Sequence, residues 1–300
     1  MKLFISIAAG CIISLAAWGG DKPIEVKSGE ALPASLITTN HLGPFKHDMP
    51  AVLPMVVVSF QTQATEKAGS MLLGGGIKYT LEGIPPALMQ KIANEAQDAI
   101  ESELKAGGWS VLPPEKVAGL EVYKSWIKDT DVSGEEVKRQ FFSAGRGTNT
   151  FSSKELERIF VGGKRPLVGN GVVLGGWTGG IALCKIGQAV GAKVILVRAI
   201  VNFANISAGK RGFFGDQTWR SNSTLEVSYA EMDVYPPDPS GATPARLATD
   251  APITLRSNFI KDVQKSGGST TIIADPDLYE KDTVEVIRCI AKGFVAKSNK

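Results

Sequence analysis

The chain has 300 residues, 43% of them hydrophobic and 21% charged, with 33 basic against 30 acidic side chains. This is ordinary globular composition, and it is sufficient for one substantial hydrophobic core. The formal net charge of +3 excludes a strong electrostatic attraction to nucleic acid or to an anionic membrane.

The start of the chain has the pattern of a secretory signal peptide. Met1-Lys2 supplies positive charge, Leu3 to Ala17 is apolar, and Ala17-Trp18-Gly19 places small residues at a signal peptidase site. The mature protein is therefore expected to begin near Gly20 and to be periplasmic, associated with the outer membrane, or secreted. An alternative stays open, because Ala8-Ala9-Gly10-Cys11 has the small residues and the cysteine of a lipoprotein cleavage box.

Three segments are expected: a signal peptide over residues 1–19, an extended lead-in over 20–53, and a single α/β domain over 54–300. The lead-in is rich in proline and lacks periodicity, which predicts an unpacked connection. It contains His41 and His47, whose separation fits neither a helix face nor a zinc motif. We therefore expect exposed loop histidines, no metal site and no cofactor.

The first half of the domain alternates strands and helices. Met55–Phe60 is an apolar, β-branched run that predicts a central strand covered on both faces. The best helical pattern begins at Pro86 and stops at Gly107-Gly108. Further predicted elements are a strand over Ile77–Leu81, a strand over Trp109–Leu112 and an amphipathic helix over Pro114–Lys128.

Asp129–Gly134 imitates the first half of a calcium-binding loop. The second half does not fit, because position twelve is glutamine rather than glutamate. A capping box formed by Ser133 and Glu136 explains the pattern better and predicts a helix over Val137–Phe142. A second capping box predicts a helix over Lys154–Phe160.

A glycine-rich stretch over Gly162–Gly180 precedes an apolar helix predicted over Ile181–Val190. Glycines before a helix can hold a phosphate group. However, Gly163-Lys164 lacks the serine or threonine that follows in a P-loop. The favoured interpretation is a flexible loop inserted into the domain.

The clearest pattern runs from Lys193 to Tyr235 and predicts a long β-hairpin. In its first arm, alternate apolar residues predict a half-buried strand, and Arg198 and Asn202 fall on the opposite face. In the second arm the apolar set changes parity beyond Tyr229, so either both faces are buried there or a bulge shifts the register. The predicted fold class is α/β in the α+β sense: a mixed β-sheet with packed helices, containing this long hairpin.

The loop between the hairpin arms combines aromatic and basic side chains, among them Arg211, Phe213, Phe214 and Trp219. This mixture suits a surface that binds a protein partner or the edge of a membrane. The alternative is that the aromatic rings pack back onto the sheet as local core.

Outside the signal peptide the chain has two cysteines, Cys184 and Cys289, both on predicted helices. An even number in an exported protein permits a disulfide, and two buried apolar thiols are the alternative. The remaining patterns predict a strand over Arg246–Ser257 and a final helix that opens at Asp275-Pro276.

Taken together, these elements resemble a known family. An apolar strand, a helix ending in Gly107-Gly108-Trp109, a helix ending at Gly191, and a returning strand that ends at Asp233 occur in that order. They are similar to the periplasmic domain of the curli secretion channel family and to the N-terminal domain of TolB-like proteins. The resemblance covers Met55 to Asn258 with interruptions. The chain departs from the curli channel in lacking two long amphipathic membrane hairpins, which puts a pore-forming role in doubt.

The resemblance implies a non-enzymatic cell-envelope protein that helps to assemble or secrete other components at the outer membrane. We expect protein partners in the envelope, a homo-oligomer and no nucleic acid partner, with peripheral membrane contact as a further option. The alternative is an exported hydrolase or ligand-binding protein with a carboxylate-based site. A catalytic triad is not expected, because both histidines lie in the lead-in.

Overall fold

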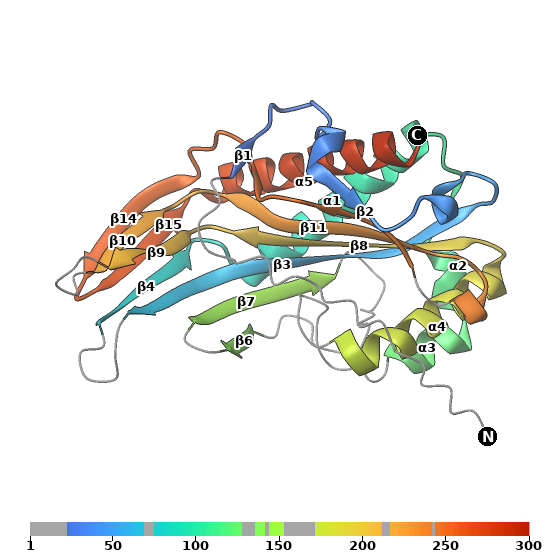
Figure 1. Cartoon of the computed structure of the whole chain (residues 1–300), viewed down its shortest axis with the longest axis horizontal. Helices are drawn as coiled ribbons and strands as arrows, with labels where there is room; N and C mark the ends of the chain where they lie inside the picture. The colour runs from blue at the N-terminus through green and yellow to red at the C-terminus, as the bar shows by residue number, and fades with distance from the viewer. Residues whose placement is uncertain are drawn as a thin grey trace, which may run out of the picture.

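Figure 1 shows the computed structural model of the chain. It describes residues 23–68, 75–127, 136–141, 144–152, 172–211, 217–241 and 244–299. The predicted signal peptide and lipoprotein box lie outside these ranges, as do residues 129–134 and the helix predicted over 154–160.

The fold is built on a mixed β-sheet whose central strand is β3 (Ala51–Ala68). This strand pairs in parallel with β8 (Lys193–Asn202) and antiparallel with β4 (Gly75–Glu82). The prediction of a central strand covered on both faces is confirmed, because Val56, Val57 and Val58 are all buried. The main path of the sheet runs β1 (Ile24–Glu25), β13 (Ile253–Thr254), β11 (Glu226–Tyr235), β8, β3, β4, β15 (Ser269–Ala274) and β14 (Ile260–Ser266). Branches off this path are β2 (Ile37–Thr39), β5 (Val111–Leu112), β6 (Glu136–Phe141), β7 (Ala144–Ser152) and β12 (Ala245–Thr249).

Helices cover both faces of this sheet, as the predicted α+β class requires (Figure 1). The upper core is apolar: Val58 and Val197 of the sheet belong to one buried cluster with Ile100 and Ile290 of the helices above them. The lower apolar core is smaller and includes Leu183. The upper face carries α1 (Pro86–Ala106) and α5 (Pro276–Ser298), and the lower face carries α2 (Glu115–Ala118), α3 (Glu121–Ile127) and α4 (Val172–Val190).

The two long upper helices begin where the sequence predicts. Pro86 opens α1 at a position where a backbone N–H would have no helical partner, and Gly108 follows its end with φ +91°, a conformation that favours glycine. Asp275 caps α5 by accepting hydrogen bonds from the backbone N–H groups of Asp277 (3.1 Å) and Leu278 (3.0 Å).

The strands β8 and β11 form the long antiparallel hairpin that the sequence predicts. The register shifts between Val227 and Tyr229, which is the expected bulge, and residues 230–235 beyond it are buried on both faces. Both consequences of the parity change are therefore present. The connection between the two arms contains β9 (Asn205–Arg211) and β10 (Gln217–Asn222), which pair as a separate two-stranded sheet.

The lead-in is packed, which corrects the prediction of an extended connection. Residues 24–40, here called the strap, lie along α5 and add β1 and β2 to the sheet (Figure 1). Leu32 and Ile37 are buried, and a Cβ atom at Gly293 of α5 would lie only 2.7 Å from the Leu32 Cβ. The apolar residues of the strap follow the surface of α5 and not a helical or strand period, so no periodic pattern indicated them. A short 3-10 helix at Ala34–Leu36 lies within the strap, and others occur at Gly43–Phe45 and Pro239–Gly241.

Four other predicted elements need correction. The helix predicted over Pro114–Lys128 is divided into α2 and α3 by Gly119. The segment predicted as a helix after a capping box at Ser133 is the strand β6, which pairs with β7. The helix α4 begins at Val172, so the last glycines of the predicted loop are helical. The strand predicted over Arg246–Ser257 is two strands, β12 and β13, and the hairpin of β14 and β15 was not predicted.

Candidate functional site

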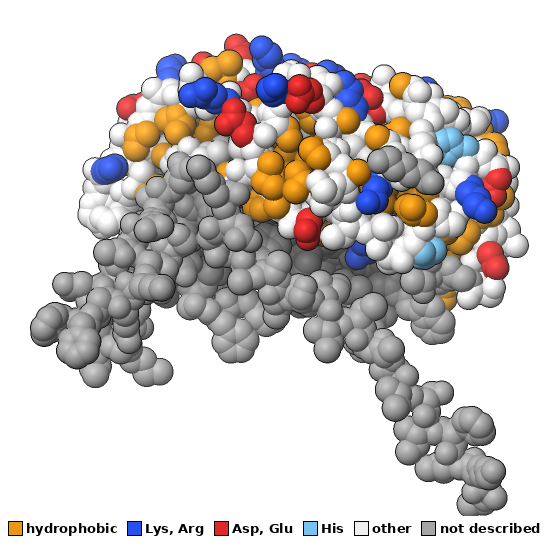
Figure 2. All heavy atoms as spheres, turned by 45° about the horizontal axis from the view of Figure 1, so that its top comes forward, with side chains coloured by type: hydrophobic (Ala, Val, Ile, Leu, Met, Phe, Trp, Pro, Cys, Tyr) orange, Lys and Arg blue, Asp and Glu red, His pale blue; other side chains and the backbone are white. Residues whose placement is uncertain are grey.

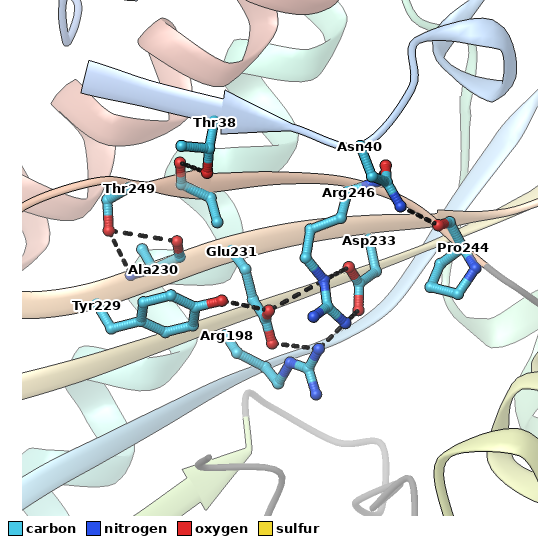
Figure 3. A network of polar contacts seen from close by, with 11 residues as sticks. Thr38, Asn40, Arg198, Tyr229, Ala230, Glu231, Asp233, Pro244, Arg246 and Thr249 are labelled. Atoms are coloured by element: carbon cyan, nitrogen blue, oxygen red, sulfur yellow. Dashed lines mark hydrogen bonds and ion pairs between the residues drawn. The ribbon is translucent and has the colours of Figure 1, made fainter. Parts of the chain in front are cut away.

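Charged side chains are buried together on the lower face of the sheet, and we call this group the ion network. It contains Arg198 of β8, Glu231 and Asp233 of β11, and Arg246 of β12. Along their strands these residues alternate with apolar residues of the upper core, so their side chains point to the lower face (Figure 3). Arg198, Glu231 and Asp233 are buried, whereas the Arg246 side chain is 33% exposed.

Asp233 is the centre of the ion network. Its Oδ2 accepts hydrogen bonds from Nη2 of Arg198 (2.6 Å) and Nη2 of Arg246 (2.9 Å), and its Oδ1 accepts one from Nε of Arg246 (2.6 Å). Glu231 contacts both guanidinium groups and accepts a hydrogen bond from the Tyr229 hydroxyl at 2.7 Å. Two positive and two negative charges therefore offset one another, which buried ions require.

The ion network also reaches the strap. Asn40, which follows β2, accepts a hydrogen bond from the backbone N–H of Arg246 through its Oδ1 (2.7 Å). Its Nδ2 donates to the carbonyl oxygen of Pro244 at 2.9 Å (Figure 3). Side chains thus connect β8, β11, β12 and the end of β2, which are neighbours in the sheet.

Burial and charge act in opposite directions on these groups. Burial is the largest influence on Arg198 and disfavours its charged form, but Glu231 and Asp233 outweigh it and raise the pKa of Arg198. Burial raises the pKa of Glu231, and the two arginines offset this only in part. The pKa of Tyr229 is also raised, first by burial, so its hydroxyl stays a neutral donor. Both carboxylates of the ion network contact both guanidinium groups, so the ion network connects β8, β11 and β12 through their side chains.

Within the described ranges, no group of three or more His, Cys, Asp or Glu side chains could hold a metal ion. His41 and His47 are exposed, as predicted. The ring of His47 lies against Trp109, with ring centroids 4.4 Å apart. Burial, followed by the charge of Lys193, lowers the pKa of His47. This histidine therefore favours its neutral form at the margin of the upper core.

The predicted disulfide between Cys184 and Cys289 is wrong. Both thiols are free and buried. Cys184 lies on α4 in the lower core, and Cys289 lies on α5 in the upper core, so the sheet separates them. The alternative of two buried thiols is the one that the structure supports. Burial also raises the pKa of both, that of Cys184 to about 11, which keeps them as unreactive thiols.

The aromatic loop that was predicted to bind a partner is only partly described. Phe213 and Phe214 lie outside the described residues. Arg211 is the last residue of β9 and pairs with Gln217, and Trp219 lies on β10 opposite Ala208. Arg211 and Trp219 therefore belong to paired strands of one two-stranded sheet, in a segment that was expected to be a loop.

Several strands extend beyond the helices at one end of the sheet, and we call this region the hairpin end (Figure 1). It comprises the outer parts of β3 and β4, the hairpin of β9 and β10, and the hairpin of β14 and β15. On β14 every residue after Ile260 is exposed, and Val263 is 42% exposed. The described sheet ends at β14, so this strand presents an open edge.

A groove of about 710 Å³ lies among the strap, α1 and the first turns of α5. Glu95 of α1 and Glu280 of α5 approach each other there, with Lys91 Nζ 2.5 Å from Glu280 and 3.7 Å from Glu95. Burial, followed by the charge of Glu280, raises the pKa of Glu95. On the face that carries α5 and the strap, basic and acidic side chains are interspersed, so no single sign of charge dominates it (Figure 2).

Sequence reasoning missed both the ion network and the carboxylate pair in the groove. Arg198 was placed on the outer face of a half-buried strand, although that face is buried as well. A usable signal was present, because Arg198, Glu231 and Asp233 all occur inside strands with apolar neighbours. Glu95 and Glu280 come from helices far apart in the sequence, so their meeting depends on how α1 and α5 pack.

Comparison with known proteins adds no relative: no protein-family model matches the chain, and no curated protein or solved structure is significantly similar to it. The resemblance to the curli channel family therefore stays a prediction. Among the described residues, none of the helices is long and apolar enough to cross a membrane.

Proposed function

We propose that the chain is an exported, non-enzymatic protein of the cell envelope that acts in assembly or secretion at the outer membrane. The hairpin end carries this proposal. Its strand β14 is exposed and lies at the edge of the described sheet, and other proteins bind such edges by adding a strand. The signal-peptide pattern at residues 1–19 supports export.

In this proposal the chain also forms a homo-oligomer, and the β9–β10 hairpin makes the contact between its copies. Arg211 and Trp219 belong to that hairpin, and Phe213 and Phe214 lie between its strands in the sequence. Aromatic and arginine side chains are the types most enriched at the energetic centres of protein interfaces.

Size-exclusion chromatography with light scattering on the exported, purified protein tests the proposed oligomer. The double variant Phe213→Ala/Phe214→Ala is expected to shift the protein to a smaller assembly while leaving its melting temperature nearly unchanged. Leu278→Ala is the matched control, because this exposed apolar residue lies on α5 and not on the β9–β10 hairpin. A marked drop in melting temperature in the double variant would show that the rings are local core, and a monomeric wild type would refute the oligomer.

A second candidate is an exported hydrolase or ligand-binding protein, and the carboxylate pair in the groove favours it. Glu95 has a raised pKa beside Glu280, and two neighbouring carboxyl groups that share a proton can act as acid and base. The test is hydrolysis of chromogenic glycosides and peptides. Glu101→Gln is the control, because Glu101 lies on α1 outside the groove. Activity that disappears in Glu280→Gln but persists in Glu101→Gln would favour the enzyme. No activity in the wild-type protein would exclude hydrolysis of these substrates.

A further inference from the structure

The strap is attached to α5 in two different ways along its length. Its second half is packed tightly: Leu32 and Ile37 are buried, and the backbone N–H of Leu32 donates to the carbonyl oxygen of Cys289 at 2.9 Å. The backbone of Leu32 also lies directly on Gly293, where a Cβ would be 2.7 Å from its carbonyl oxygen. The second half of the strap is therefore firmly attached to α5.

The first half of the strap, residues 24–31, is attached mainly through polar contacts, and we call it the flap. Its strand β1 has only two residues, and the side chains of Lys27 and Glu30 are 84% and 62% exposed. A turn at Gly29, with φ +81°, brings the backbone toward α5. Val26 is its one buried apolar side chain, at 9% exposure.

Three residues on one face of α5 hold this turn. Glu285 Oε1 accepts hydrogen bonds from the Ser28 hydroxyl (2.9 Å) and from the backbone N–H of Gly29 (2.6 Å). Lys292 Nζ donates to the carbonyl oxygen of Gly29 at 2.9 Å, and Cys289 Sγ lies 3.6 Å from the carbonyl oxygen of Lys27. Hydrogen bonds to charged groups are the stronger kind, so Glu285 is the main attachment of this turn to α5. The start of the flap is held separately, because the backbone N–H groups of Ile24 and Val26 donate to the carbonyl oxygens of Pro252 (2.8 Å) and Thr254 (2.9 Å).

The flap also forms one wall of the groove described above, which residues 25–28 line together with Glu285. We infer that residues 24–31 are a hinged flap over this groove, with Glu285 as the latch and the tightly packed Leu32 as the hinge. Opening of the flap would break the two-residue pairing of β1 with β13, widen the groove and uncover Cys289, while the second half of the strap stays in place.

Hydrogen exchange measured by mass spectrometry on the full chain tests the hinge. In Glu285→Ala, amides of residues 24–31 are expected to exchange about tenfold faster, whereas those of residues 32–39 keep the wild-type rate. Lys297→Ala is the control, because Lys297 Nζ binds the carbonyl oxygen of Ala34 in the second half of the strap at 3.2 Å. That variant should leave exchange in the flap unchanged. Equal acceleration of both halves in Glu285→Ala, or none, would overturn the inference.

Thiol labelling gives an independent readout of the same opening. A maleimide should modify Cys289 several-fold faster in Glu285→Ala than in wild type, because the flap covers its sulfur. Cys184, buried on the opposite side of the sheet, is the internal control and should keep its rate. Equal acceleration of both thiols would mean global destabilisation and would refute a local flap.

Discussion

The two faces of the sheet are built from the same strands but are stabilised by different physics. On the upper face Val197 and Met232 pack with apolar side chains of α1 and α5. Their neighbours Arg198, Glu231 and Asp233 point to the lower face and form the ion network. The apolar core responds gradually to changes in volume, whereas the ion network depends on every member being present. A strand can therefore tolerate change at one residue and not at the next.

The largest effect is expected on the lower face. Asp233→Asn changes the size of the side chain very little but leaves Arg198 and Arg246 with one carboxylate between them. Removing one partner from a buried ion network typically costs about 3–5 kcal/mol in the free energy of unfolding. Urea unfolding followed by circular dichroism measures this loss.

Asp262→Asn is the matched control for that experiment. Asp262 is exposed on β14, so its change in unfolding free energy should stay within about 0.5 kcal/mol. A loss of less than about 1 kcal/mol in Asp233→Asn would contradict a cooperative ion network and would make the two faces equivalent.

A small substitution on the upper face should reduce the free energy of unfolding by less. Ile290 of α5 lies in the apolar core, and Ile290→Val removes one methyl group from it. Such truncations typically cost about 0.5–1.5 kcal/mol, because the surrounding side chains relax only in part. The same urea experiment applies. A loss as large as that in Asp233→Asn would abolish the proposed difference between the faces.

How much of this fold follows from sequence also differs between its parts. The strand β3, the helices α1 and α5, and the β8–β11 hairpin were predicted, because a continuous run or a regular period of apolar residues marks each of them. The bulge in β11 was one of two alternatives that the change of parity left open. The strap was missed because Leu32 and Ile37 fit the surface of α5, which exists only once the helix is packed. The capping box at Ser133 predicts a helix where the structure has β6, because a capping box is a local signal that the pairing with β7 overrides.

The candidate sites were harder to predict than the fold. Residues of the β9–β10 hairpin were found as a sequence cluster, since they are neighbours along the chain. Members of the ion network come from three strands, and Arg246 meets Asp233 only through the pairing of β11 with β12. The disulfide failed for the same reason, because the sequence does not state on which side of a sheet a helix packs.

A smaller effect should depend on pH and come from the margin of the upper face, where His47 lies against Trp109. In the folded state the pKa of His47 is lower than its usual 6.5. Burial is the main cause, the charge of Lys193 adds to it, and the charge of Asp48 opposes both. The unfolded chain therefore binds the proton more readily, so the contribution of His47 is complete above pH 6.5 and declines as the pH falls toward the folded pKa.

His47→Phe keeps an aromatic ring on Trp109 and removes the titration. The variant should lose less stability than wild type between pH 7 and pH 5, as measured by thermal unfolding at a series of pH values. Since His47 is exposed, the difference is expected to be small. His41→Phe is the control, because it removes a histidine outside this contact with Trp109. Parallel curves of melting temperature against pH for His47→Phe and wild type would show that other groups control stability in this range.

The smallest expected effect concerns the two cysteines, one on each face of the sheet. Cys184 belongs to the lower core and Cys289 to the upper core, and both are free thiols. A disulfide normally raises stability by restricting the unfolded chain, and removing one typically costs about 2–5 kcal/mol. Because the sheet separates the two thiols, dithiothreitol should leave the melting temperature of the oxidised, purified protein unchanged. A clear decrease with reductant would mean that the cysteines are bridged, and α4 and α5 would then have to lie on the same side of the sheet.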